Sequence, residues 1–241
     1  GINFVNVPTT LLAMVDASVG GKTGINFGGL KNEIGAFAFP QTVIIDTQWL
    51  ETLDHENLLS GYAEMLKHGL ITERKLLPTL LNFDTATFNL HQLSDMLKVS
   101  VAIKEQIVEQ DPHEQGIRKA LNFGHTFGHA FEEWAMTRHP ILHGYAVAYG
   151  MVCELYLSAI KQGFPQTIMR QTVNFIRNNY GTLPITCDDY DAIISLMIHD
   201  KKNAGNNINF SLLHDLGSVV INRIATEEEI KDALDFLREG V

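Results

Sequence analysis

The chain has 241 residues, of which 45% are hydrophobic and 19% charged, a composition that favours a folded core and excludes intrinsic disorder. With 18 Lys and Arg against 28 Asp and Glu, the formal net charge is −10, so bulk electrostatics predict no attraction to nucleic acid or to an anionic membrane. No apolar run reaches the length of a membrane span, and the first residues do not resemble a signal peptide. Cys153 and Cys187, without a CxxC motif, are expected to be reduced thiols of a cytoplasmic protein.

The first part of the chain, residues 1–53, is predicted to be part of an α/β domain. Segments 4–7 and 42–46 are expected to be strands, and the second is a β-branched run typical of a buried strand. Between them we expect a short helix over 11–18 and a Gly-rich stretch over 20–35.

The rest of the chain, residues 54–241, is predicted to be a mainly α-helical domain, because apolar residues recur there at helical spacing. Helices are expected over 58–70, 76–81, 90–108, 120–136, 146–161, 166–179, 190–198 and 226–239. Strands are expected over 208–213 and 219–221. The fold class is therefore an α/β remnant followed by a mainly helical domain.

A group of histidines and one carboxylate predicts a metal site. His125 and His129 are four residues apart, so one continuous helix would place them on the same face. His143 follows in Leu-His-Gly, and Glu64 lies upstream in the segment GYAEMLKHG. Two or three His with one Glu suit zinc and leave a coordination position open. A lone His is more often a core or surface residue than a metal ligand. Spacing alone would favour His125 and His129, but it does not say which two histidines bind the metal.

Scattered cations in an acidic chain predict a pocket for a small anion. The Gly-rich segment 15–32 contains Asp16, Lys22, Lys31 and Asn32, and such loops expose backbone N–H groups to anions. It matches neither a Walker A loop nor GxGxxG, so a flexible turn is the alternative. Further cations that are individually typical of a solvated surface, but together suit a polyanionic substrate, are Lys67, Lys104, Arg118, Lys201 and Lys202.

At these segments the sequence resembles 3-dehydroquinate synthase, of the sugar-phosphate cyclase superfamily. The resemblance runs in the family order from Val7 to Asn203. Its motifs are VPTTLLAMVDASVGGKTGIN, KNEIGAF, GYAEMLKHGLI, KEQIVEQDPHEQGIRKALNFGHTFGHAFE, LHGYAVAYGM and HDKKN.

The resemblance implies a carbon–oxygen lyase of the shikimate pathway, which leads to chorismate and the aromatic amino acids. Its reaction converts 3-deoxy-D-arabino-heptulosonate 7-phosphate into 3-dehydroquinate and phosphate, with NAD and Zn²⁺ or Co²⁺ as cofactors. The family also implies a cytoplasmic homodimer. Residues 1–53 would be the C-terminal part of the NAD-binding domain, and residues 54–241 the metal- and substrate-binding domain.

The resemblance further implies roles for individual residues. The metal ligands are expected to be Glu64, His125 and His143, which leaves His129 to handle protons. The other residues expected to act in catalysis are Lys67, Asp16 and Asn122. Those expected to bind substrate are Lys22, Asn32, Lys104, Arg118 and a Lys of the pair Lys201 and Lys202. The dinucleotide is expected to contact Thr9, Thr10, Lys22, Lys31, Trp49, Leu50, Glu51 and Thr52.

The sequence departs from the family in two places. The GGG-x-x-GD phosphate-binding motif that the family carries upstream of Pro-Thr-Thr is not in this chain, which predicts weak NAD binding but intact metal binding. Tyr145 stands where the family often has Glu.

Three other interpretations are open. The first is another sugar-phosphate cyclase acting on a substrate without a carboxylate, against which Lys104, Arg118 and Asn122 argue. The second is a glycerol-dehydrogenase-like enzyme, which would not need so many Lys in its pocket. The third is an inactive fragment that folds and binds metal only.

Overall fold

The structure is a computed structural model that describes residues 2–27, 30–72, 75–199 and 208–240. Its α-helices are α1 (His55–Ile71), α2 (Leu76–Leu81), α3 (Leu90–Gln110), α4 (His125–Met136), α5 (His143–Gln162), α6 (Gln166–Tyr180), α7 (Tyr190–His199) and α8 (Glu227–Glu239). Shorter helical segments are η1 (Ala13–Ala17), η2 (Thr47–Thr52), η3 (Ile117–Asn122) and η4 (Cys187–Asp189). The strands are β1 (Val5–Asn6), β2 (Lys22–Phe27), β3 (Leu30–Phe37), β4 (Thr42–Val43), β5 (Asn209–Asp215) and β6 (Ser218–Ile224).

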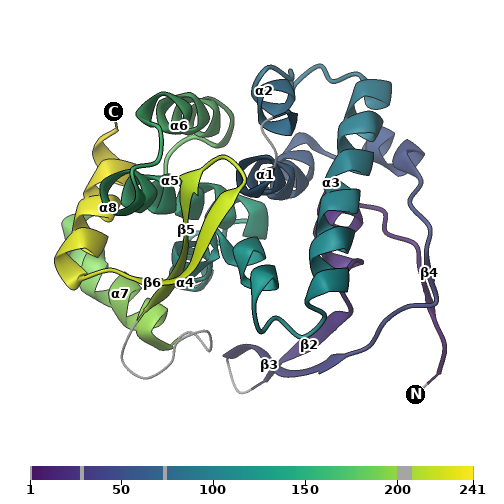
Figure 1. Cartoon of the computed structure of the whole chain (residues 1–241), viewed down its shortest axis with the longest axis horizontal. Helices are drawn as coiled ribbons and strands as arrows, with labels where there is room; N and C mark the ends of the chain where they lie inside the picture. The colour runs from purple at the N-terminus through teal and green to yellow at the C-terminus, as the bar shows by residue number, and fades with distance from the viewer. Residues whose placement is uncertain (1, 28–29, 73–74, 200–207, 241) are drawn as a thin grey trace.

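Helices make up most of the molecule, and the strands form three separate pairs (Figure 1). In Figure 1, α2 lies above α1 and α3 to its right, whereas α4 to α8 and the antiparallel β5–β6 hairpin occupy the left half. The β2–β3 hairpin lies at the lower edge, below α3. Among the described residues, no helix is both long enough and apolar enough to cross a bilayer.

The first 53 residues form two small strand pairs. β1 pairs in parallel with β4, and the Gly-rich stretch folds into the antiparallel pair of β2 and β3. The strand expected over 42–46 is thus only two residues long, and Ile44 is 52% exposed, so the expectation that it is buried was wrong. The reason is that only β1 pairs with it in the described chain, and a two-residue ladder gives its side chains no layer to pack against.

The helices follow the predicted order, with one difference in the middle of the chain. The helix expected over 120–136 is divided into η3 and α4 at Gly124, which has a φ of 81°. This left-handed conformation suits glycine and ends a right-handed helix. The division makes His125 the first residue of α4, so His125 and His129 still share one helix.

α1 is buried on all sides, and this burial creates the setting for the site. Every residue from Leu58 to Ile71 is buried, including Glu64, Lys67 and His68. The helix begins where Asp54 accepts a hydrogen bond of 2.9 Å from the N–H of Asn57. Charged side chains are almost never fully buried unless they are paired, so the polar residues of α1 require partners inside the protein.

Two glycines of α5 allow backbones to approach closely. A Cβ atom on Gly144 would lie 1.9 Å from the carbonyl oxygen of Ser60 in α1, and one on Gly150 would lie 2.0 Å from the carbonyl oxygen of Gly124. Both distances are far inside van der Waals contact, so only glycine fits. The starts of α4 and α5, at His125 and His143, are therefore set by direct contact between main chains.

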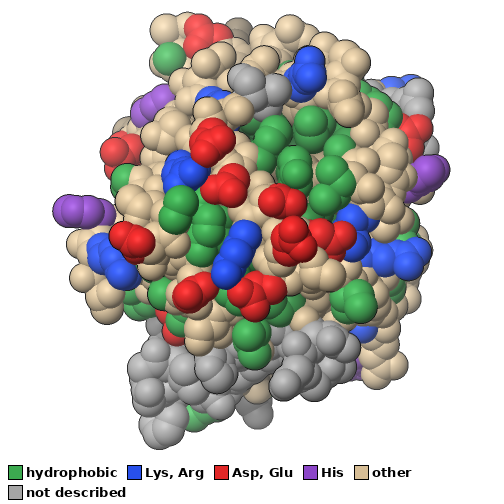
Figure 2. Space-filling model, turned by 90° about the vertical axis from the view of Figure 1, so that its left-hand side faces the viewer, with side chains coloured by type: hydrophobic (Ala, Val, Ile, Leu, Met, Phe, Trp, Pro, Cys, Tyr) green, Lys and Arg blue, Asp and Glu red, His purple; other side chains and the backbone are tan. Residues whose placement is uncertain are grey.

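The outer face of α8 and α7 is acidic. Figure 2, which views the molecule from the left of Figure 1, shows red Asp and Glu side chains gathered over this face around a few Lys and Arg. Lys231 on α8 pairs with Glu227 at 2.8 Å and with Asp191 on α7 at 3.2 Å. Such exposed pairs are screened by solvent, so this face adds little to stability.

We expect Gly150→Ala to lower the free energy of unfolding by about 3 kcal/mol or more, because overpacking forces the α4 and α5 backbones apart. Gly163→Ala is the control, since an added Cβ at Gly163 meets no atom within 4 Å and the positive φ of Gly163 (73°) is its one source of strain. Backbone strain alone should cost the control about 1 kcal/mol. Urea denaturation of the two variants measures this, and equal losses would contradict the steric explanation.

Candidate metal and substrate site

Three side chains from three helices meet inside the protein. Glu64 on α1, His125 at the start of α4 and His143 at the start of α5 each offer one ligand atom, and these atoms all lie within 4.8 Å of one another. Glu64 Oε1 lies 3.4 Å from His125 Nε2 and 3.6 Å from His143 Nε2. Glu64 and His125 are buried, whereas His143 is partly exposed, so the cluster opens to solvent beside His143.

The hydrogen bonds behind the two imidazoles determine which ring nitrogen carries the proton. His125 Nδ1 lies 3.1 Å from the carbonyl oxygen of Phe123, and His143 Nδ1 lies 2.9 Å from Glu132 Oε2. Carbonyl and carboxylate oxygens only accept hydrogen bonds, so both Nδ1 atoms donate. When the rings are neutral, each Nε2 therefore presents a lone pair toward Glu64.

This arrangement fits a divalent cation. Two nitrogen lone pairs and a carboxylate oxygen converge, and Glu64 Oε1 has no hydrogen-bond partner of normal geometry among the described residues. Buried polar atoms ordinarily have such a partner. Two imidazoles and one carboxylate are a known ligand set for zinc that leaves a position open, so the residues present suit Zn²⁺.

The charges around the cluster favour a cation at its centre. Burial alone would raise the pKa of Glu64, but the ammonium of Lys67, which donates to Glu64 Oε2, and the nearby His125 hold that pKa well below its usual value. Burial alone would lower the pKa of His143, yet the hydrogen bond to Glu132 and the nearby carboxylate of Glu64 raise it to about 9. Glu64 thus stays ionised and the position facing it attracts positive charge.

A second ion pair, buried at Lys104 and half-buried at Asp16, lies beside the cluster. Lys104 Nζ on α3 donates to the carboxylate of Asp16 in η1 and, over 2.6 Å, to the backbone carbonyl of Asp16. Burial would raise the pKa of Asp16, but Lys104 lowers it to about 2. Burial also lowers the pKa of Lys104 despite this partner, so the cost of burying the cation offsets part of the gain at Asp16. The pair therefore fixes a cation in place more than it stabilises the fold.

Arg118 holds two loops together. It is 2% exposed, and its Nη1 donates to the carbonyl oxygen of Pro112 over 2.6 Å and its Nη2 to that of Gly20 over 2.8 Å. Its Cζ atom lies 5.8 Å from the ring centroid of Phe37 on β3. The expected contact between Arg118 and a substrate carboxylate stays a prediction.

The residues Lys22 and Asn122, both expected to act on substrate, share a partner that sequence reasoning missed. Glu114 Oε2 pairs with Lys22 Nζ, and Glu114 Oε1 accepts a hydrogen bond of 2.7 Å from Asn122 Nδ2. Glu114 has a φ of 57°, which is uncommon for a residue other than glycine. No pattern in the sequence indicates this conformation.

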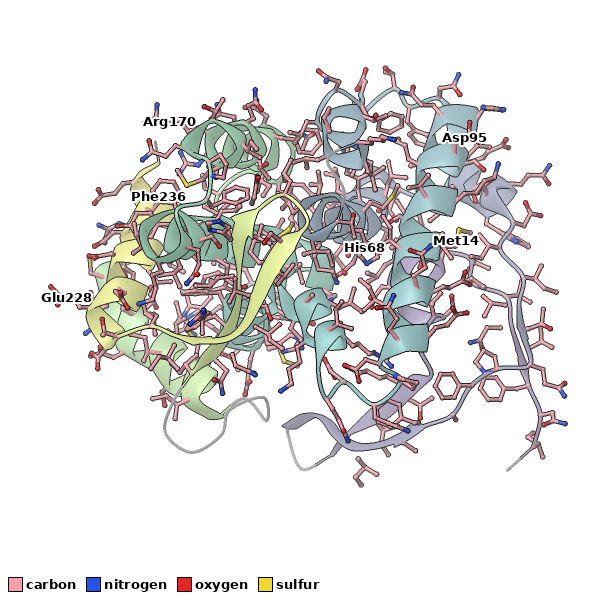
Figure 3. The ribbon with its side chains drawn as sticks, in the orientation of Figure 1. Met14, His68, Asp95, Arg170, Glu228 and Phe236 are labelled. Atoms are coloured by element: carbon pink, nitrogen blue, oxygen red, sulfur yellow. The ribbon has the colours of Figure 1, made fainter. Side chains whose placement is uncertain are left out.

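Two further polar groups, the half-buried Glu132 and the buried His68, were also missed. Glu132 lies on α4 seven residues after His125, and this spacing could have placed it on the same helix face. His68 Nδ1 lies 2.7 Å from Ser100 Oγ and joins α1 to α3, in the region that Figure 3 labels. Burial lowers the pKa of His68 to about 3, so this histidine is neutral between two buried lysines.

His129 lies beside the metal cluster but outside the set of converging ligand atoms. Its ring centroid is 5.4 Å from that of His125 and 6.1 Å from that of His143. The one-turn spacing from His125 would permit coordination, but the ring nitrogens of His129 are not in the set of ligand atoms within 4.8 Å of one another, so its position agrees better with a role next to the metal.

The residues expected to contact the dinucleotide are only partly described. Thr10 Oγ1 accepts the N–H of Ala13 over 3.2 Å, which caps the helical turn that follows. In the segment 49–52, Trp49 is 50% exposed and the Leu50 side chain is buried in the core. The side chains that could contact a dinucleotide are therefore those of Trp49, Glu51 and Thr52. Thr9 is exposed. The side chains of Lys31 and Asn32, in β3, lie outside what the structure describes, as do Lys201 and Lys202.

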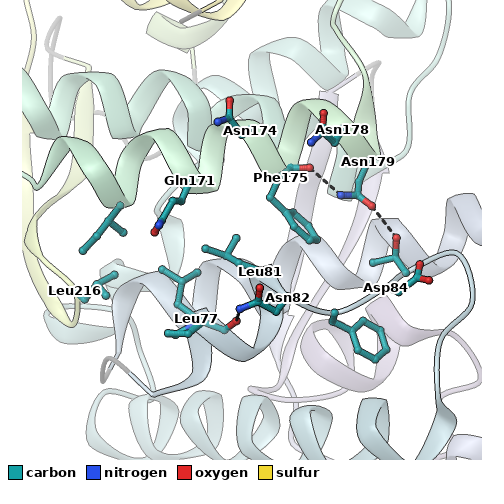
Figure 4. Close-up of a pocket in the computed structure, with 14 residues that line it drawn as sticks. Leu77, Leu81, Asn82, Asp84, Gln171, Asn174, Phe175, Asn178, Asn179 and Leu216 are labelled. Atoms are coloured by element: carbon teal, nitrogen blue, oxygen red, sulfur yellow. Dashed lines mark hydrogen bonds between the residues drawn. The ribbon is translucent and has the colours of Figure 1, made fainter.

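A cavity of about 940 Å³ between α2 and α6 is separate from this cluster (Figure 4). Leu77 and Leu81 line one side, and Gln171, Phe175 and Asn178 line the other. None of the expected metal, substrate or cofactor residues is among its lining residues. Its wall of apolar and amide side chains with one carboxylate, Asp84, does not suit a polyanion, so we do not place the site there.

Comparison with known proteins agrees with the expected family. A sequence model described as "3-dehydroquinate synthase N-terminal" matches residues 1–60, and one described as "3-dehydroquinate synthase C-terminal" matches residues 61–203. The 3-dehydroquinate synthase of Parabacteroides distasonis is 55% identical over 241 residues, which are 100% of this chain and 68% of that protein. That of Listeria innocua is 42% identical over 242 residues, 100% of this chain and 66% of that protein. The chain thus spans about two thirds of the length of these relatives.

Solved structures of other cyclases share the fold. The 2-epi-5-epi-valiolone synthase of Streptomyces hygroscopicus, with NAD⁺ and Zn²⁺ bound, has a TM-score of 0.86 and 26% identity, covering 98% of this chain and 66% of that chain. A 2-deoxy-scyllo-inosose synthase complexed with carbaglucose-6-phosphate, NAD⁺ and Co²⁺ has a TM-score of 0.84 and 25% identity, covering 100% of this chain and 67% of that chain. An iron-containing alcohol dehydrogenase of Thermotoga maritima, at 15% identity and a TM-score of 0.60, shares only the fold.

Zinc titration distinguishes the two candidate histidine pairs. We expect His125→Ala to weaken zinc binding by more than about 100-fold, because it removes a ligand and not merely an outer partner. His129→Ala should keep the zinc affinity within about threefold of the starting value, since His129 is outside the group of converging ligand atoms. Calorimetry measures both, with the exposed His139→Ala as control. A loss in His129→Ala as large as in His125→Ala would show that His129 is a ligand.

The Asp16–Lys104 pair gives a second test. Asp16→Ala should lower the free energy of unfolding at pH 7 by about 3 kcal/mol, because Lys104 is left buried without its partner. Adding Lys104→Met should recover most of this loss, since the uncompensated charge is then gone. Urea denaturation compares the single and double variants, and a double variant less stable than the single one would refute this account of the pair.

Proposed function

The chain belongs to the 3-dehydroquinate synthase family, and from this premise we propose that it contains the metal site and much of the substrate site of such an enzyme. The proposed reaction converts 3-deoxy-D-arabino-heptulosonate 7-phosphate into 3-dehydroquinate and phosphate. The observation that carries the proposal is the convergence of Glu64, His125 and His143 with Lys67 beside them. The proposed cofactors are NAD and Zn²⁺ or Co²⁺, which the two cyclase structures contain.

In this proposal the chain's own residues bind, orient and move protons. When bound, NAD supplies a hydride acceptor and donor, and the divalent metal polarises a substrate oxygen. Glu64, His125 and His143 hold the metal, and Lys67 keeps Glu64 ionised. His129, whose ring lies 5.4 Å from that of His125, is near enough to exchange protons with a substrate at the metal near neutral pH.

The anionic ends of the substrate are proposed to meet fixed cations. Lys104 is held in place by Asp16, so it offers a preorganised positive charge that needs no reordering on binding. Lys22 and Asn122 are linked through Glu114, and a substrate oxyanion that bound both would replace that carboxylate. Arg118 is proposed to add a further cation beside them. The family resemblance adds Asn32 and one of Lys201 and Lys202 to the proposed substrate-binding residues.

Related activities on the same fold are less well supported. The other sugar-phosphate cyclases are 25–26% identical to this chain, against 55% for the 3-dehydroquinate synthase of P. distasonis. The dehydrogenase fold neighbour, at 15% identity, gives no argument for its own activity here. The buried pairs of Lys67 and Lys104 with carboxylates favour an anionic substrate, which a simple alcohol dehydrogenase would not require.

Several parts of the proposal rest on the family resemblance. These are the lyase class, the place in the shikimate pathway, a cytoplasmic homodimer, and the division into an NAD-binding part over 1–53 and a metal- and substrate-binding part over 54–241. The dinucleotide contacts proposed for Thr9, Thr10, Lys22, Lys31 and the segment 49–52 rest on it as well.

The test is a hybrid enzyme. Because this chain matches 68% of the P. distasonis protein, it can replace the matching part of that enzyme. We expect the hybrid, with NAD⁺ and Zn²⁺, to release phosphate from the seven-carbon substrate at a rate within about tenfold of the parent enzyme, a barrier difference of about 1.4 kcal/mol.

The same hybrid carrying Glu64→Gln is the control and should be inactive, since a metal ligand is lost. A folded hybrid that binds zinc and NAD⁺ but releases no phosphate would refute the proposed reaction. A hybrid that is inactive on the seven-carbon acid but active on a substrate without a carboxylate would favour the activity of another sugar-phosphate cyclase.

A further inference from the structure

Glu154 is a fully buried carboxylate that neither the motifs nor the proposed reaction uses. It lies on α5, and its Oε2 accepts a hydrogen bond of 2.8 Å from the N–H of Gly124. Its Oε1 accepts one of 3.1 Å from the N–H of Thr126. The carboxylate therefore bridges the two residues on either side of His125.

The same short segment determines how His125 is aimed. Gly124 has the left-handed φ of 81° that turns the chain into α4, and Gly150 packs against its carbonyl oxygen. Phe123 supplies the carbonyl that accepts the Nδ1 proton of His125, which directs Nε2 toward Glu64. Holding the N–H groups of Gly124 and Thr126 therefore also holds the acceptor and the backbone that orient the imidazole.

The charge of Glu154 has a separate effect. The N-terminus of a helix carries a partial positive charge of about half an electron, which disfavours a nearby cation. His125 is the first residue of α4, so a metal on this ligand would lie close to that end. A buried anion that accepts hydrogen bonds from the first amides offsets this charge, in the way that an acidic cap does.

We propose that Glu154 is a positioning residue for the metal site, which orients His125 through the backbone of residues 123–126 and offsets the positive end of α4. The inference rests on the proposed function, since it requires that His125 bind a divalent cation. It predicts that the charge and the reach of Glu154 affect metal binding even where the fold is unchanged.

The experiment compares variants of one helix. Glu154→Gln removes the charge and places an N–H₂ group against one of the two amides. Ser158→Ala, one turn further along α5, is the matched control, because Ser158 Oγ donates to the carbonyl of Glu154 over 2.6 Å and accepts the N–H of Leu213 over 2.9 Å. The control loses buried hydrogen bonds in the same helix without touching residues 123–126.

Zinc affinity is measured by competition with a chromophoric chelator, and Co²⁺ absorption reports ligand geometry independently of turnover. We expect Glu154→Gln to lower zinc affinity by about 10–100-fold, the range seen when outer partners of ligands are changed, and to alter the Co²⁺ spectrum. Ser158→Ala should keep the zinc affinity within about threefold of that of the wild-type chain, a smaller change than 10-fold, and should leave the Co²⁺ spectrum unchanged. Equal losses in the two variants, or wild-type affinity in Glu154→Gln, would overturn the inference.

Glu154→Asp serves if the Gln variant does not fold. The Asp side chain keeps the charge but is one methylene shorter. We expect a measurable loss of zinc affinity that is smaller than the loss expected for Glu154→Gln. An unchanged zinc affinity and Co²⁺ spectrum would overturn the positioning role. A wild-type chain that binds no zinc would overturn the proposed metal function together with this inference. Zinc binding that is normal in the wild type and in every Glu154 variant would overturn the inference alone.

Discussion

The structure depends on the burial of one carboxylate, that of Glu64, in the middle of a helix with no exposed side. An ionised carboxylate in such a place is costly unless opposite charges and donors surround it. Lys67 supplies the donor to one oxygen, while the other oxygen faces two imidazole nitrogens. The neighbouring helices must therefore bring cations to α1, and the arrangement of α3, α4 and α5 around it satisfies this requirement.

The same requirement explains why polar groups form a continuous buried layer. Asp16 and Lys104 continue the alternation of charge that begins at Glu64 and Lys67. His68, neutral and bonded to Ser100, lies between the two lysines without adding a third positive charge. Because each charged group lowers the cost of burying its partner, loss of one member of a pair leaves an uncompensated charge, and such paired charges are typical of functional sites and not of core packing.

Much of the fold and of the candidate site could be predicted from the sequence, because helical periodicity and the order of the motifs are visible in the sequence itself. The helices, the late β-hairpin and the grouping of Glu64 with histidines were all predicted, and the choice of His143 over His129 came from family resemblance and not from spacing. The break at Gly124 was not predicted, because glycine in a helical pattern is compatible with both outcomes. Glu114, Glu132 and Glu154 were missed because their roles depend on partners brought close only by folding.

The glycine contacts of α5 have a consequence for which ions the site accepts. α5 touches α1 at Gly144 and the start of α4 at Gly150, main chain against main chain. Side chains can change rotamer to relieve crowding, but backbones in contact cannot, so the helices that carry Glu64, His125 and His143 are held at fixed relative positions. If these residues bind the proposed ion, this fixed arrangement would suit a small cation with few ligands, such as Zn²⁺, better than Ca²⁺, which requires about six or more oxygens. Discrimination between ions would then come from the close approach of three backbones as well as from the chemistry of the ligands.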